Sequence, residues 1–304
     1  MASRPISEAE RRHRLGWAKI ISLALACGFG VALILANAPS WDLEDMDAYW
    51  NAGLRLRSGF PLYPAVPDPG AADVFRYAPW FAWIWVPLTY VPKWAVQFGW
   101  TALLLGSIAV ALVPLARTKS VAAVCLVAVL GGLLVRTAST GNVHALMIAG
   151  LAFGANRRSG PIWIGLAGSL KFVPLGYVLV YLGRGDWRRA GMAVAIAGVL
   201  LAPALLYDLS GYPTEAGDSL SLLSLAGRLP WMALAVVCTV AAVRFARTRY
   251  AWLAASLAVL SGIPRLALYD FTYLLVGIAP ARPGSHAAAD AREMPPGGGQ
   301  LTRT

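Results

Sequence analysis

Four acidic side chains lie within six positions near the start of the chain, in the stretch WDLEDMDAYWNAG (41–53): Asp42, Glu44, Asp45 and Asp47. A well-placed carboxylate can act as a general base, because it can take the proton from a hydroxyl group as that hydroxyl attacks. A solvated acidic linker between two membrane helices would explain the same four residues. The choice between the two interpretations depends on which other polar groups the fold brings to this place.

Further polar side chains interrupt or end the apolar stretches that follow. They are Arg76, Arg136, Asn142, His144, Lys171, Arg228, Arg265 and Asp270. A cation within an apolar stretch is costly unless it reaches water or a partner. A phosphate group would be a suitable partner, since guanidinium and ammonium groups neutralise its oxygens and donate hydrogen bonds to them.

Simpler explanations exist for several of these side chains. Arg76 can extend its charged end toward lipid head groups, and His144 can be a hydrogen-bonded packing residue. Arg265 and Asp270 can pair with each other across a helix turn. The ring of Tyr49, next to the acids, can stack on a sugar or belong to the aromatic belt at a membrane surface.

The composition indicates that the elements carrying these residues are membrane helices. Of the 304 residues, 58% are hydrophobic and only 13% are charged, whereas soluble domains carry about 25% charged residues. The mean hydropathy is +0.60. The net charge of +11 is divided into short basic clusters between apolar stretches, which is typical of cytoplasmic loops and not of a nucleic-acid-binding surface. All three cysteines fall inside apolar stretches, so no disulfide framework is predicted.

Placing the basic clusters inside the cell predicts a topology. Residues 1–16 form a cytoplasmic segment, 17–36 a first span that is not a cleaved signal peptide, and 37–78 an acidic outer loop. The tail 281–304, rich in Pro, Gly and Ala, is predicted to be disordered and cytoplasmic. Together 17–280 form a single transmembrane domain of an all-α, polytopic membrane protein with about nine to eleven spans. Beyond the first, we expect apolar spans near 94–116, 120–136, 143–156, 190–207, 229–246, 250–263 and 266–280.

Three stretches do not fit simple span counting. Residues 79–92 are apolar but short, so they form either a brief crossing or, as the positive-inside rule favours, an interfacial or re-entrant element. Residues 160–183 have arginine clusters on both sides, which favours two short helices that meet at Lys171–Pro174 near the outer side. Pro264 breaks the stretch 261–270 in the same way.

The sequence contains no motif for the commonest cofactors. It has no P-loop, no GxGxxG after a strand, no CxxC and no HExxH. We therefore expect no metal and no cofactor.

Five stretches of the chain form an ordered set of motifs. They are DMDAYWNAGLRLRSGFPLY (45–63), FRYAPWFAWIWVPLTYVP (75–92), GNVHALMIAGL (141–151), GLAGSLKFVPLGYVLVYLGRGDWR (165–188) and IPRLALYDFTYLL (263–275). In this order they resemble the D-x-x-x-Y…A…G-x-P-x-Y, Y-x-P…P-L…P, G-Q-x-N, K-x-x-P and S-P…Y-D segments of glycosyltransferase family 87, polyprenol-phosphate-mannose-dependent α-mannosyltransferases of the GT-C superfamily. Asn142 stands where the family usually has Gln.

The resemblance implies a GT-C-like bundle and an inverting transfer of a hexose. The hexose would be mannose, because that is the sugar that the family transfers. The donor would be a polyprenyl-phosphate sugar, and the acceptor a glycolipid or envelope glycan hydroxyl at the outer face of the plasma membrane. Asp45, four residues before Tyr49, matches the family's acid and is expected to be the general base, with Asp47 as the second candidate. Lys171 and Arg265 are the leading candidates for phosphate contacts.

The resemblance also implies substrate-binding roles for further residues, which are Tyr49, Arg76, Asn142, His144 and Asp270. Two other classes of protein fit the same sequence. A transporter or flippase for a lipid-linked sugar would explain the broken helices and an intramembrane lysine, and a noncatalytic membrane scaffold would explain the apolar composition. A transporter should place its polar groups near the membrane midplane and show repeat symmetry, and no internal repeat is evident in this sequence.

Overall fold

The computed structural model describes residues 21, 24–25, 28, 30–32, 41–65, 74–116, 121–212 and 222–278. The predictions for the N-terminal segment, most of the first span, the second half of the outer loop and the tail lie outside these residues. Every regular element in the described part is helical. The α-helices are α2 (Glu44–Arg57), α3 (Pro79–Leu88), α4 (Lys93–Ala116), α5 (Val121–Ser139), α6 (His144–Gly154), α7 (Gly160–Leu170), α8 (Val178–Arg184), α9 (Trp187–Leu201), α10 (Leu222–Ala226), α11 (Arg228–Arg244), α12 (Ala251–Gly262) and α13 (Leu274–Ile278).

Three helical segments of the described chain are long and apolar enough to cross a membrane. They are Lys93–Val113 in α4, Val121–Ser139 in α5, and Trp187–Leu206, which joins α9 to the short 3-10 helix η3 (Ala202–Leu206). The all-α prediction is confirmed for the described residues, and the apolar helices support membrane association. The predicted nine to eleven spans are not confirmed, because helices such as the 12-residue α12 rise only about 18 Å against a hydrocarbon core of about 30 Å.

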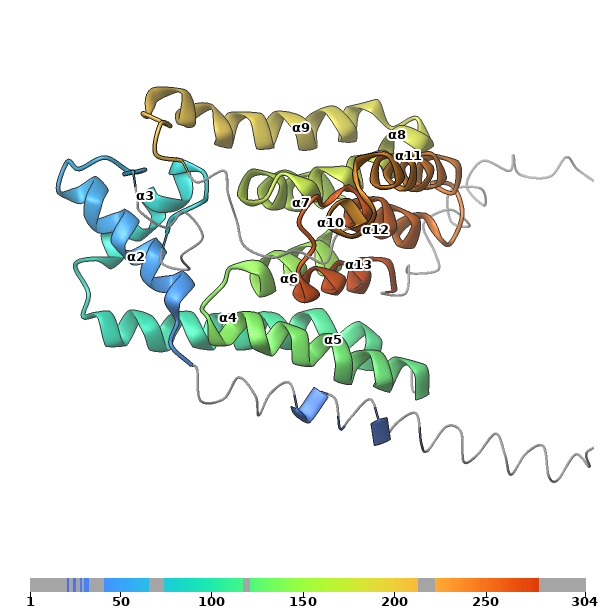
Figure 1. Cartoon of the computed structure of the whole chain (residues 1–304), viewed down its shortest axis with the longest axis horizontal. Coiled ribbons are helices and arrows are strands. Elements are labelled where there is room, and N and C mark those ends of the chain that lie inside the picture. The colour runs from blue at the N-terminus through green and yellow to red at the C-terminus, as the bar shows by residue number, and fades with distance from the viewer. Residues whose placement is uncertain are drawn as a thin grey trace, which may run out of the picture.

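The axes of the long apolar helices are roughly parallel, and the chain runs in opposite directions in α4 and α5 (Figure 1). α4 and α5 lie side by side along one edge, α9 lies along the opposite edge, and α6, α7, α12 and α13 lie between them. α2 and α3 pack on each other and form a separate lobe at the end of the bundle where α4 begins and α9 ends.

The acidic stretch is helical, so the segment 37–78, predicted to lie outside the membrane, is not merely an irregular linker. Residues Glu44–Arg57 form α2, and its acids fall in the first turn, where they interact favourably with the helix dipole. Met46, Tyr49, Trp50 and Gly53 are all buried and recur at positions i, i+3, i+4 and i+7, the spacing of one helix face.

The proline-based predictions of helix breaks are confirmed. α7 ends at Leu170, Lys171 has an extended backbone, and the chain resumes as the 3-10 helix η2 (Val173–Tyr177) and then α8. α12 ends at Gly262, and a bend at Pro264 separates it from the 3-10 helix η4 (Leu268–Tyr273). α3 has ten residues, so the short apolar stretch 79–92 contains a single helix that rises only about 15 Å.

Candidate functional site

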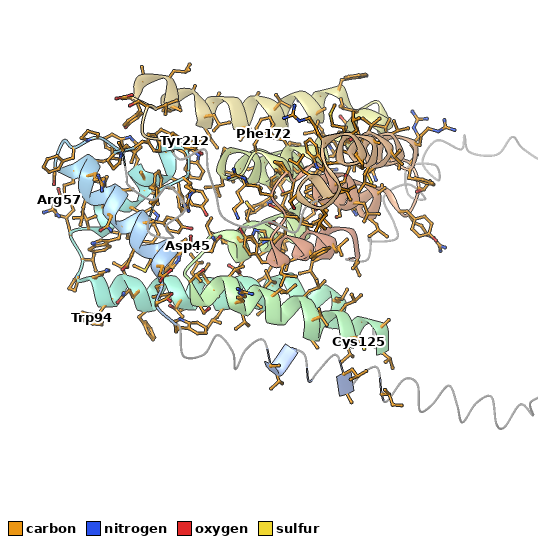
Figure 2. All side chains as sticks on the ribbon, in the orientation of Figure 1. Asp45, Arg57, Trp94, Cys125, Phe172 and Tyr212 are labelled. Carbon is orange, nitrogen blue, oxygen red and sulfur yellow. The ribbon has the colours of Figure 1, made fainter. Side chains whose placement is uncertain are left out.

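A cavity of about 760 Å³ lies where the two-helix lobe meets the bundle. Its wall is built from the start of α2, residues 74–77, the end of α5 and the turn after it, the break between α7 and η2, and residues 266–269. Asp45, Phe172 and Tyr212 line it from three separate elements and are labelled in Figure 2. Segments more than 200 residues apart in the sequence therefore share one site.

Asp45 is the one carboxylate in the described wall, and only one of its oxygens is held. Its Oδ2 accepts hydrogen bonds from Thr140 Oγ1 at 2.8 Å and from Asn142 Nδ2 at 3.1 Å. Among the described residues no donor is bound to Oδ1 and no cation forms a salt bridge with this carboxylate. The side chain is thus fixed in direction while one oxygen stays able to accept a proton.

The turn that holds Asp45 is itself tied to α2 and α4. The Asp45 backbone N–H donates to Thr140 O at 2.8 Å, and Trp100 Nε1 donates to Gly141 O at 2.8 Å. Gly141 has φ +77°, and a Cβ there would lie 2.8 Å from Met46 Cβ, so a larger residue would push the turn away from α2. This close approach explains why Thr140 reaches the carboxylate.

Asn142 is a positioning residue in this structure. Its Oδ1 accepts the backbone N–H of His144 at 2.9 Å, at the start of α6, while its Nδ2 donates to Asp45. Since both ends of the amide are used, the side chain is fixed between α2 and α6. The Asn142 amide thereby orients the Asp45 carboxylate. These two hydrogen bonds account for the position of Asn142 without the predicted direct contact with substrate.

Three cations line the same cavity: Arg76, Arg136 and Lys171. The Lys171 ammonium lies 4.9 Å from the centre of the Tyr269 ring, which favours the charged form. Burial alone lowers the pKa of Lys171, but the phenol oxygens around it and the Asp270 carboxylate outweigh burial, so the pKa lies well above its ordinary value. The lysine thus lies among phenol oxygens and one carboxylate in the wall of the cavity.

Tyr77 also lines the cavity, and the sequence did not single it out. Burial is the main cause that raises its pKa to about 12, so it is a neutral phenol at physiological pH. Its hydroxyl accepts a hydrogen bond from Tyr49 at 3.1 Å, which leaves its own proton available to an acceptor in the cavity. Thr140 and Tyr212 were missed too; Thr140 directly follows the end of α5, while Tyr212 lies in an irregular segment after η3.

Two of the predicted residues on α2 lie outside this wall. Asp47 pairs with Lys93 at 2.9 Å, with both side chains partly exposed. Tyr49 is fully buried, and its hydroxyl accepts the Val143 backbone N–H at 3.2 Å. Tyr49 thus supports the segment after α5 through its hydrogen bond with Val143, and it does not line the cavity.

Three other predicted residues lie near the cavity without lining it. His144 is fully buried, with Nε2 2.8 Å from Thr272 Oγ1. Since the Thr272 hydroxyl donates to Tyr269 O, it accepts from the imidazole. Asp270 is buried and accepts the Ala267 backbone N–H at 2.8 Å, while Arg265 is exposed on the bend before η4 and is not part of the wall.

The arrangement suits a reaction in which a proton is removed beside a bound anion. One carboxylate oxygen is open, and three cations lie around the same space. No group of three metal-ligating side chains occurs in the part of the chain that the structure describes. Comparison of the chain with protein-family models, with curated proteins and with solved structures finds no match.

Proposed function

We propose that this chain is a membrane glycosyltransferase that moves a hexose, mannose in the first instance, from a polyprenyl-phosphate donor to a hydroxyl of a lipid-linked or envelope glycan. The observation that carries the proposal is the cavity in which Asp45, held on one oxygen only, faces Arg76, Arg136 and Lys171. Such a transfer requires a general base for the acceptor hydroxyl and cationic side chains that bind the donor phosphate. The sequence resemblance described above supplies the donor and the sugar.

The proposed reaction uses Asp45 as the general base. Its free oxygen takes the proton of the acceptor hydroxyl, whose oxygen forms a bond to the anomeric carbon from the face opposite the phosphate. The bond from that carbon to the phosphate oxygen breaks, and polyprenyl phosphate leaves with the electron pair, so the configuration inverts. A positioned base contributes about 10²–10⁴-fold in rate, and the cations stabilise the charge that develops on the leaving phosphate.

The chain path and the positions of the basic clusters support placing the cavity on the extracytoplasmic side of the membrane. α5 ends at the cavity, so the links after α6, α8 and α11 fall at the opposite end of the bundle. These links carry arginine pairs or clusters within 156–158, 184–189 and 244–249. Under the positive-inside rule that end is cytoplasmic, which leaves the cavity on the outer side.

A reconstituted assay tests the proposal. The purified protein is incubated with labelled polyprenyl-phosphate mannose and a membrane glycolipid extract, and transfer to the extract is measured. We expect Asp45→Asn to lose about 10²–10⁴-fold in rate and Asp47→Asn to keep its activity, because Asp47 lies on the same helix but outside the cavity. Undiminished transfer by Asp45→Asn would contradict the base assignment. If no polyprenyl-phosphate sugar reacts and the protein moves such lipids across a vesicle membrane, the transporter alternative is correct.

A further inference from the structure

A second, apolar cavity of about 280 Å³ adjoins the cationic cavity. We call it the apolar groove; it lies between α10, α11, α12 and η4, and its wall includes Trp231, Cys238, Leu257, Leu260 and Phe271. The neighbouring helices are seen in Figure 1. Ser261 is the one hydroxyl-bearing residue in its described wall, and that hydroxyl is already used, because it donates to Ala258 O at 3.0 Å. Trp231 Nε1 is buried and has no hydrogen-bond partner among the described residues, so apart from this one N–H the groove offers mainly dispersion contacts.

The two cavities meet at Leu266. This side chain lines the cationic cavity and the apolar groove alike, and the residues that follow it, Ala267–Tyr269, continue the cationic wall. A ligand that fills both would need a negatively charged head on one side of Leu266 and a hydrocarbon part on the other.

We propose that the apolar groove binds the first part of the hydrocarbon chain of the polyprenyl phosphate whose head group occupies the cationic cavity. The assignment of the head group rests on the proposed function. Beyond the groove, Leu229, Val236 and Val237 on α11 are 80%, 60% and 63% exposed, so the rest of the chain can continue into the lipid.

The molecule has another apolar cavity that does not adjoin the cationic cavity. Another apolar cavity of about 300 Å³, lined by residues of α4 and α5 such as Ile108 and Val127, has a similar size and an apolar wall. It shares no lining residue with the cationic cavity. An apolar wall is thus common to both cavities. The groove differs because it adjoins the cationic cavity, where the phosphate head group would lie.

Cys238 supplies a readout that needs no substitution and no catalysis. It lies in the wall of the groove, while Cys125 on α5 lies in neither cavity and serves as the internal control. The purified full chain is alkylated with N-ethylmaleimide, and the modification at each cysteine is followed by mass spectrometry of its peptide. Undecaprenyl phosphate is the probe, with undecaprenol and inorganic phosphate as comparisons.

We expect undecaprenyl phosphate at about nine times its Kd to slow alkylation of Cys238 about tenfold, because mass action leaves about a tenth of the sites empty. The rate at Cys125 should change less than twofold, inorganic phosphate should protect neither cysteine, and undecaprenol should need a higher concentration. Lys171→Met should raise the concentration of the phosphate probe needed for protection about tenfold and leave that of undecaprenol unchanged.

Two results would overturn the inference. One is unprotected Cys238 under conditions in which the same preparation transfers mannose from a polyprenyl-phosphate donor; the proposed function would then stand and the groove assignment would fall. The other is equal protection by undecaprenol and undecaprenyl phosphate, which would separate the groove from the cations. Protection that depends on the phosphate and on Lys171, in a preparation without transfer, would support the groove and refute only the reaction.

Discussion

The hydrogen bonds that hold Asp45 Oδ2 allow a test of whether the carboxylate must be positioned. Thr140→Val is nearly isosteric and removes only the hydroxyl that lies 2.8 Å from Oδ2. That hydroxyl also lies 3.1 Å from Thr137 O, but its single proton can serve only one acceptor well, and the charged, nearer carboxylate is favoured. The variant therefore removes mainly one charge-assisted hydrogen bond.

The size of the effect follows from the strength of that bond. Hydrogen bonds to charged groups contribute about 1.5–3 kcal/mol to stability, and because the pair is only partly buried we take the lower end, about 1.5 kcal/mol. If Asp45 is the base and its direction matters, the freed carboxylate must regain the productive direction at a free-energy cost of about this size, and 1.36 kcal/mol corresponds to a tenfold change in rate. We expect Thr140→Val to lower kcat about tenfold and to change KM less than about twofold, since the donor phosphate contacts are untouched.

The control is Thr140→Ser, which keeps the hydroxyl and should restore most of kcat. Adding Asn142→Ala to Thr140→Val removes both bonds to Oδ2, and the combined loss should exceed that of either single change without being strictly additive. Rates are measured with polyprenyl-phosphate mannose, and unfolding in detergent is measured alongside to show that each variant is folded. A folded double variant with wild-type kcat would refute the idea that Asp45 must be held to act.

Three further predictions concern the surroundings of the site. Gly141→Ala should destabilise the fold by about 3 kcal/mol in denaturant unfolding, because it places a side chain at φ +77° and against Met46; an unchanged midpoint would contradict the close approach. Lys171→Met should raise the KM for the phosphate donor about tenfold, and more at low salt than at high salt, whereas equal KM values would remove Lys171 from the phosphate site. Asp47→Asn should cost less than about 1 kcal/mol in unfolding, because its ion pair with Lys93 is partly exposed; a larger loss would show that the pair is more than a surface contact.

The sequence was a good guide to the helix breaks and to the polar residues of the cavity wall. Pro174 and Pro264 predicted where the chain interrupts its helices, since proline lacks the N–H that a helix interior needs. The cost of placing a cation beside apolar stretches pointed to Arg76 and Lys171, and both line the cavity. These inferences succeed because each depends on the chemistry of one residue and its neighbours in sequence.

The roles of Tyr49, Asn142 and His144 could not be read from the sequence. Each depends on a contact between distant segments: Tyr49 with Val143, Asn142 with Asp45, and His144 with Thr272. A polar side chain near a site can face the ligand or support the residue that does, and its type is the same in both cases.

The charges around the cavity favour a group transfer over the carriage of a lipid. Asp45 is bonded to the neutral donors Thr140 and Asn142, although three cations line the same cavity, so its negative charge is not neutralised by an ion pair. In the proposed reaction this charge is the one that moves: Asp45 becomes neutral when it takes the proton, and the leaving phosphate gains a negative charge beside the cations. Interactions that grow as charge develops accelerate the chemical step. A carrier that is not coupled to protons has no such redistribution to stabilise and no use for a carboxylate placed to take up a proton.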